Sequence, residues 1–192
     1  MKPKPALLSP LIRSDVQGLI LARLFMNPVF EYSITELAEF AITSVPTAMR
    51  EVDRLAAASY IETRSVGRVR LIRANREHPL FSAIFQIVAH SYGPSTVLPQ
   101  ALAGLFGLQR ALIHGQWAER LAQIPGDIPE SIDLLLIGNM NRIDSAKSLV
   151  PAEVALGKRF NLQFATDWDW QREASEWLVQ IKSGHLYEIS LG

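Results

Sequence analysis

"IHGQWAERLAQIPGDIPESIDLLLIG", residues 113–138, is the stretch that sets the expected fold of the second half of the chain. Its pattern predicts a short strand, a tight turn at Gly115, the start of a helix, a loop and a second strand. The second strand, residues 132–137, is almost purely apolar and ends at Gly138, which indicates burial on both faces. One acid, Asp133, lies inside this strand and needs a structural or chemical explanation.

Strands and helices continue to alternate on both sides of this stretch. The expected elements are strands at 110–114, 162–165 and 186–190 and helical segments at 116–123, 144–159 and 167–183. Such alternation is typical of a small α/β domain, which we place at residues 108–192.

Composition excludes several classes of protein. With 192 residues, of which 48% are hydrophobic, the chain can bury the core of one large or two small domains. It has no cysteine, which excludes disulfides, thiolate zinc sites and cysteine nucleophiles, and its 4 histidines are too scattered to form a metal motif. Because the start lacks a leader pattern and no apolar run approaches the ~18 residues of a membrane span, we expect a cytoplasmic protein without a membrane segment.

A net charge of zero hides an asymmetry between the two halves. Residues 1–78 hold 11 Lys and Arg against 8 Asp and Glu, a net +3, whereas residues 79–192 hold 8 against 11, a net −3. Within the basic half, residues 64–76 contain five arginines and no acid. Such a patch favours nucleic-acid binding, and a solvated surface is the alternative.

Three short helices are expected before the basic segment. Apolar spacing predicts an amphipathic helix at 14–25, and a Ser-x-x-Glu capping box at 33–36 opens a second helix that ends near residue 41. A third helix begins at 43–44 and tolerates Pro46 in its first turn. Its inner stripe is expected to consist of Val45, Met49, Val52 and Leu55.

The opposite stripe of the third helix is polar near its N-terminal end. It carries Ser44, Thr47, Arg50 and Arg54. Strands predicted at 60–65 and 68–73 then form a β-hairpin around 66–67, whose tip and edges carry Arg64, Arg68 and Arg70. Two short helices and a basic hairpin are the arrangement that places a recognition helix in the major groove of double-stranded DNA and a wing beside it. A solvated helix face is the alternative.

Residues 33–81, "SITELAEFAITSVPTAMREVDRLAAASYIETRSVGRVRLIRANREHPLF", resemble the winged helix-turn-helix of ArsR-like bacterial transcription regulators. The resemblance implies a DNA-binding domain at residues 11–78. It also implies base contacts from Ser44, Thr47 and Arg50, and phosphate contacts from Arg64, Arg68 and Arg70. The thiolate metal sites of that family cannot form without cysteine, so metal responsiveness is not expected.

Residues 79–107 join the two halves. They predict a helix at 79–92 with a wide apolar stripe, a break at Gly93-Pro94 and a shorter helix at 95–106. We interpret this segment as a helical connector and dimer surface, because operator binding usually matches two-fold protein symmetry to palindromic half-sites. Plain core between the domains is the alternative.

The block from about residue 110 to 191 resembles the minimal nucleotidyltransferase domain of the polymerase-β-like superfamily, which also occurs fused to winged helices. In that family a Gly-Ser turn at a helix start holds the triphosphate. Two carboxylates of an Asp-x-Asp strand, with a third acid on a later strand, hold two Mg²⁺ ions. The resemblance places the corresponding nucleotide site at Gly115, Gln116, Ser131 and Asp133.

This stretch keeps the turn of that site but not its charge. Gln116 stands in place of the serine, Ser131 in place of the first acid, and the later strand offers Asn161 and Gln163 in place of the third acid. Asp133 alone cannot hold two metals. We therefore expect no metal, no Mg²⁺ or nucleotide cofactor, and no catalytic residues.

Other polar residues near this stretch are expected to be structural. Asp127 and Glu130 lie in the preceding loop, where acids are usually solvated. His114 is expected to be packed, because no acid has motif spacing to it. Arg120 weakly matches the basic residue that follows the turn in the family. Asp133 matches the second acid of the Asp-x-Asp motif. The alternative is that it lies at the rim of the sheet and hydrogen-bonds a neighbouring loop.

The sequence therefore predicts an α+β protein, with an N-terminal winged helix-turn-helix followed by a small α/β nucleotidyltransferase-like domain. We expect a DNA-binding transcriptional regulator that forms a homodimer, whose second domain is non-catalytic and serves sensing, dimerisation or protein interaction. Two alternatives stay open. One is an active nucleotidyltransferase whose winged helix binds substrate, and the other is an antitoxin-type protein with a protein partner.

Overall fold

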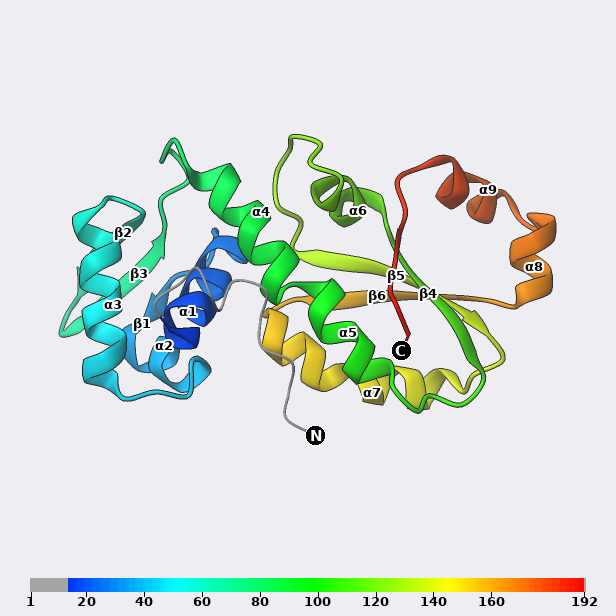
Figure 1. Ribbon diagram of the computed structural model, residues 1–192, viewed down its shortest axis with the longest axis horizontal. Helices are drawn as coiled ribbons and strands as arrows, with labels where there is room; N and C mark the ends of the chain where they lie inside the picture. Colours follow the sequence, from blue (N-terminus) through cyan, green and yellow to red (C-terminus); the bar gives the residue numbers. More distant parts are fainter. Residues whose placement is uncertain (1–13, 192) are drawn as a thin grey trace. The chain divides into compact units, whose positions relative to one another are not determined.

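A computed structural model describes residues 14–191 of the chain. It is a mixed α+β structure with two separate sheets, one of three strands and one of four (Figure 1). The chain divides into two compact units, with the division between Gly93 and Pro94. Within the described residues, no helix combines the length and the apolar character needed to cross a membrane.

The first unit contains a helix, a strand, two helices, a hairpin and a last helix. They are α1 (Asp15–Met26), β1 (Tyr32–Ser33), α2 (Ile34–Phe40), α3 (Val45–Ala57), β2 (Ile61–Val66), β3 (Val69–Ala74) and α4 (Phe81–Tyr92). The helices and the hairpin expected before residue 78 are confirmed within one or two residues at each end.

Side-chain caps explain why the starts of the first three helices could be predicted. Ser14 caps α1, and the Ser44 hydroxyl caps α3 by accepting a hydrogen bond from the Thr47 backbone N–H at 3.4 Å. The capping box of α2 is complete, because Glu36 Oε2 accepts from the Ser33 N–H at 2.7 Å and Ser33 Oγ accepts from the Glu36 N–H at 3.2 Å. Each such cap is worth about 1 kcal/mol.

The first sheet is antiparallel, with the strand order β1-β3-β2. β2 and β3 pair along their full length, and Gly67 in the turn has a φ of 58°, which glycine adopts at low cost. β1 adds only Tyr32 and Ser33 to the edge of β3. The sequence does not predict β1, because two residues are too few to show an alternating pattern.

Half of the predicted inner stripe of α3 is confirmed, because Val52 and Leu55 are buried. Val45 and Met49 were also expected inside, but they are 40% and 42% exposed. Ala48 is fully buried instead, and Glu51 is buried with its carboxylate accepting a hydrogen bond from Arg54 Nη1 at 2.7 Å. The buried face of α3 is thus rotated from the expected stripe toward Ala48 and Glu51.

The segment expected to form one connector, residues 79–107, is divided between the two cores. α4 packs on α1, where the rings of Phe81 and Phe25 stack with centroids 5.4 Å apart. α5 (Pro94–Leu102) belongs to the second unit and packs on α7 (Arg142–Leu156). Each helix therefore finds its partner in a different unit.

The second unit is a four-stranded sheet with helices around it (Figure 1). Besides α5 and α7, its elements are β4 (Leu108–His114), α6 (Gly115–Leu121), β5 (Ser131–Gly138), β6 (Arg159–Ala165), α8 (Asp167–Arg172), α9 (Glu176–Ser183) and β7 (Tyr187–Glu188). The strand order is β6-β5-β4-β7, and β5 with β6 is the parallel pair. The expected alternation and the doubly buried β5 are confirmed, since Ile132 and residues 134–137 are each 0% exposed.

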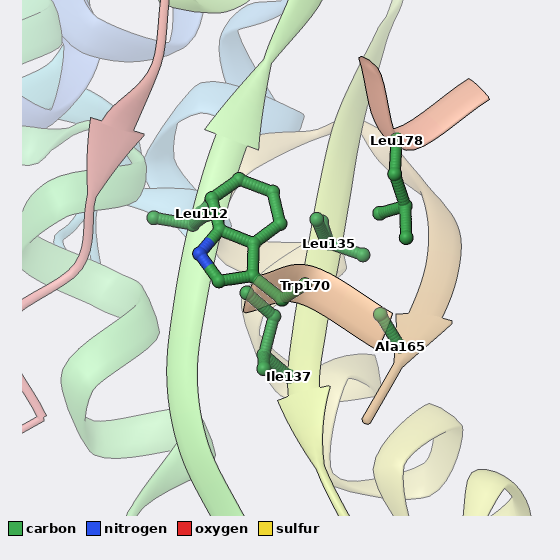
Figure 2. Close-up of a cluster of buried hydrophobic side chains, with 6 residues drawn as sticks. All are labelled: Leu112, Leu135, Ile137, Ala165, Trp170 and Leu178. Atoms are coloured by element: carbon green, nitrogen blue, oxygen red, sulfur yellow. The ribbon is translucent and has the colours of Figure 1, made fainter. Parts of the chain in front are cut away.

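One face of this sheet is apolar at one end and polar at the other. The apolar end packs beneath α8 and α9 in a buried cluster, shown in Figure 2, of Leu112, Leu135, Ile137, Ala165, Trp170 and Leu178. Side chains two positions apart along a strand share a face. His114, Asp133 and Asn161 therefore lie on the same face as this cluster, beyond its edge.

Helix boundaries in this unit differ from the sequence pattern in two places. The helical segment expected at 167–183 is two helices, interrupted where Glu173 takes a φ of 52°. α7 begins at Arg142 because Asn141 caps it, and it ends before Gly157, which has a φ of 67°. β6 consequently starts at Arg159, three residues before the predicted strand.

Candidate functional site

The exposed polar stripe of α3 forms a connected set of donors and acceptors. Arg50 Nη2 donates to Thr47 Oγ1 at 3.1 Å, and the hydroxyls of Thr47 and Ser44 lie 3.0 Å apart. All three residues lie in the first half of α3 or at its cap. Arg54, one turn further on, is also exposed, and it pairs with Glu51.

The β2–β3 hairpin lies beside α3, and an ion pair connects the two. Arg70 Nη1 of β3 is 2.6 Å from Asp53 Oδ1 of α3. Asp53 lies on the exposed side of the helix, as does Arg50. The side chains of α3 and of the hairpin can therefore meet one elongated ligand together.

Two more arginines of the hairpin, Arg64 and Arg73, also pair with carboxylates. Arg64 donates through Nε and Nη2 to both carboxylate oxygens of Glu31, and this bidentate contact lowers the pKa of Glu31 below its usual value. Arg73 Nη2 lies 2.6 Å from Glu62. The patch at 64–76 is thus acid-free in sequence but not in space. Sequence reasoning missed Glu31 and Asp53 because they lie outside that stretch.

Two of the predicted DNA-contacting arginines stay without an ion pair among the described residues, Arg50 on α3 and Arg68 at the hairpin tip. The ion pairs of Arg64 and Arg70 are at least partly exposed, whereas Arg54 pairs with the buried carboxylate of Glu51. Exposed pairs contribute about 0–1 kcal/mol, so a phosphate can replace the carboxylate of Glu31 or Asp53 at low cost. The surface can therefore offer Arg50, Arg64, Arg68 and Arg70 to a polyanion.

A second polar cluster occupies the polar end of the β4–β5–β6 sheet. Asn161 Nδ2 donates to Ser131 Oγ at 3.0 Å and to Asp133 Oδ1 at 2.9 Å. Gly115 faces the same carboxylate, because a Cβ built there would lie 2.8 Å from Asp133 Oδ2. The fold thus brings together three of the four residues that the sequence assigned to a nucleotide site, and it adds Asn161. The fourth, Gln116, is exposed on α6.

His114 is a buried residue of β4, which confirms that it is packed, but it also has an acid beside it. It lies directly opposite Asp133 in the antiparallel β4–β5 ladder. Burial lowers the pKa of His114, and the Asp133 charge and a hydrogen bond with Gln163 oppose that shift. Spacing along the sequence could not reveal this pair, because strand register brings together residues that are 19 positions apart.

Residues of the polar cluster do not fit a pair of Mg²⁺ ions. Asp133 supplies a carboxylate, but Ser131 and Asn161 are neutral and the Asn161 amide donates to Asp133. Two-metal sites need several carboxylates to balance the charge. Within residues 14–191, no group of three or more His, Asp or Glu side chains could hold a metal ion.

Two buried basic residues, Arg120 and Lys158, donate hydrogen bonds to backbone carbonyls of the loop at 122–130. Arg120 is buried on α6 and donates to the Asp127 carbonyl at 3.4 Å, so it supports the loop and does not face a ligand. Lys158, which the sequence analysis did not single out, is buried and donates to the Pro129 carbonyl at 2.7 Å. Burial lowers the pKa of Lys158 to about 8, although Glu130 opposes the shift.

Comparison with protein-family models finds no match to the chain, and comparison with curated proteins finds no significant match. Function therefore has to be inferred from the two clusters themselves.

Proposed function

We propose that the chain is a DNA-binding transcriptional regulator that holds double-stranded DNA with α3 and the β2–β3 hairpin. The observation that carries the proposal is the Arg70–Asp53 ion pair, because it shows that the basic hairpin lies alongside the exposed, arginine-bearing face of α3. The element order supports the proposal, because a β-hairpin directly after the second helix of a tight helical pair is what a winged helix-turn-helix would require.

In this proposal each part of the surface has its own role. Ser44, Thr47 and Arg50 face base edges in the major groove, where arginine pairs with guanine. Arg64, Arg68 and Arg70 contact phosphates, which supply most of the affinity and make it dependent on salt. Arg54 extends the phosphate contact along α3.

For the second unit, we propose a non-catalytic role in sensing, dimerisation or protein interaction. The single carboxylate of the Ser131–Asp133–Asn161 cluster supports this, because nucleotidyl transfer needs more charge than it offers. We further propose a cytoplasmic homodimer, with α4 in the dimer surface. Leu80 and Ile87, which flank the buried side of α4, remain exposed and support that placement.

The proposed function is tested by selecting DNA with the full-length protein. Sheared genomic DNA of the source organism is mixed with the protein at low salt, and bound fragments are recovered and sequenced. We expect enrichment of a few related sites with two-fold symmetry. No binding to any fragment at low salt, or equal recovery of all fragments, would contradict the proposal.

A further inference from the structure

We infer that the start of α3 reads thymine, through the C5 methyl group, with three exposed apolar side chains: Ile42, Val45 and Met49. The inference rests on the proposed function and adds to it the base that the surface prefers. Two of these residues were expected in the core, but they are partly exposed to solvent, on the edge of the exposed face of α3 that lies opposite its polar stripe.

Ile42 is the most informative of the three. It lies in the turn between α2 and α3, two residues before the Ser44 cap, and it is 92% exposed. Its φ is 49°, a left-handed conformation that costs a residue with a Cβ about 1–2 kcal/mol and is rare for a β-branched one. Glycine or asparagine would fit this turn at lower cost. A large side chain kept at a strained and exposed position indicates a contact made outside the unit.

Val45 and Met49 extend the apolar surface along α3. They are four residues apart, which places them on the same side of the helix, next to each other. Arg50 follows directly, without an ion pair among the described residues, and its guanidinium is held by Thr47 Oγ1. The exposed face of α3 therefore carries the apolar side chains along one edge and a cation with two hydroxyls along the other.

This combination fits duplex DNA better than the apolar face of a protein. In the major groove, the thymine methyl is the apolar group that a base presents, and guanine offers arginine two acceptors. A protein surface that covered the whole exposed face of α3 would also bury the cation of Arg50 and would have to pair it. We therefore assign the patch to a half-site in which thymines adjoin a guanine.

Uracil substitution tests the inference on single methyl groups. Each thymine of a site recovered by selection is replaced in turn by uracil, which keeps the base pair and removes one methyl. We expect about fourfold weaker binding at one or two positions, the effect of exposing one apolar carbon. Binding of the full-length protein that is equal for all uracil duplexes would overturn the inference while leaving the proposed function standing. Absence of binding to any duplex would overturn both.

Variants separate base reading from folding. In Met49→Ser and Val45→Ser, the uracil penalty should disappear at the position that each residue reads, while Val150→Ser, at an exposed position on α7, should keep it. Ile42→Gly should melt at the same or a higher temperature, because it relieves the backbone strain, and still bind the thymine site more weakly. A variant Ile42→Gly with unchanged DNA affinity and altered self-association would overturn the inference in favour of a protein interface.

Discussion

The two units of the protein differ in the cations that they bury. In the first, four arginines lie at the surface and pair with carboxylates: Arg54, Arg64, Arg70 and Arg73. The second also has exposed pairs, such as Arg159 with Glu153, but it buries Lys158 and Arg120 as well. Backbone carbonyls accept hydrogen bonds from both buried cations, and Arg120 also pairs with Glu119.

Exposed, paired arginines suit a surface that binds a ligand, whereas buried cations such as Lys158 suit a part of the protein that keeps a fixed structure. Exposed ion pairs contribute little and can exchange a carboxylate for a phosphate. A buried cation cannot be exposed to a ligand without disrupting its surroundings, and its desolvation costs stability. The basic surface of the first unit is therefore a candidate for binding a polyanion, and charge changes at Lys158 and Arg120 should act on stability instead.

The largest expected effect is a pH-dependent stability difference at Lys158. Its pKa is about 8 in the folded protein, lowered from 10.5, so between these values the unfolded chain holds a proton that the folded chain has released. The contribution of Lys158 to the free energy of unfolding should thus rise with pH across this interval, by about 3 kcal/mol. Urea unfolding of the protein and of Lys158→Met, at pH 7.5 and pH 10, measures it.

The advantage of Lys158→Met over the unchanged protein should shrink by that amount as the pH rises. Lys147→Met, on the exposed side of α7, is the matched control for loss of an ammonium group. A difference between Lys158→Met and the unchanged protein that stays constant over this range would mean that Lys158 keeps its proton, and the contrast between the units would weaken.

A smaller effect is expected from Arg50→Ala on sequence preference. If Arg50 contacts a guanine, its loss should weaken binding to the selected site on the order of 10- to 100-fold, with much less change for unrelated duplexes. Competition gel shifts measure the ratio of the affinities for the selected duplex and for unrelated duplexes. Arg159→Ala, which removes an 85% exposed arginine of the second unit, is the control and should leave it unchanged.

A further prediction concerns the carboxylates that neutralise the hairpin. Asp53→Asn and Glu31→Gln remove the charges that pair with Arg70 and Arg64. Each should tighten DNA binding at low salt, by roughly threefold to tenfold, because one negative charge less faces the phosphates. Titrations at two salt concentrations should show the gain fading at the higher one. Weaker binding by both variants would mean that the ion pairs serve to position the arginines.

No effect at all is expected from Asp133→Ala on nucleotide transfer, because none should occur. Incubation of the protein with labelled nucleotides and Mg²⁺ or Mn²⁺ should label neither the protein, RNA nor small acceptors. DNA affinity should also be unchanged by the substitution. Transfer that Asp133→Ala abolishes would overturn the non-catalytic assignment and would support the nucleotidyltransferase alternative.

Local features of the fold could be predicted from the sequence because their causes are local. The capping box at Ser33 and Glu36 marks a helix start, and the apolar run of β5 marks a buried strand. The inner face of α3 could be predicted only in part from hydrophobicity, because Ala48 and Glu51 take buried positions while Val45 and Met49 lie outside.

Features that depend on distant residues could not be predicted. Arg64 and Glu31 are 33 positions apart, and only folding brings them into a bidentate contact. His114 and Asp133 meet through strand register. The acid-free stretch at 64–76 thus overstated the positive charge of the surface. The neutral residues at Ser131 and Asn161, in contrast, could be read directly from the sequence, because the identity of a residue does not depend on folding.

The most direct test of the DNA-binding claim is the salt dependence of affinity for the selected duplex. Fluorescence anisotropy gives the binding constant at several salt concentrations for the unchanged protein, Arg68→Ala and Arg159→Ala. Loss of one phosphate contact should reduce the slope of log K against log salt by about 1 for Arg68→Ala and leave it unchanged for Arg159→Ala. Equal slopes for all three proteins, or binding that does not depend on salt, would contradict the account.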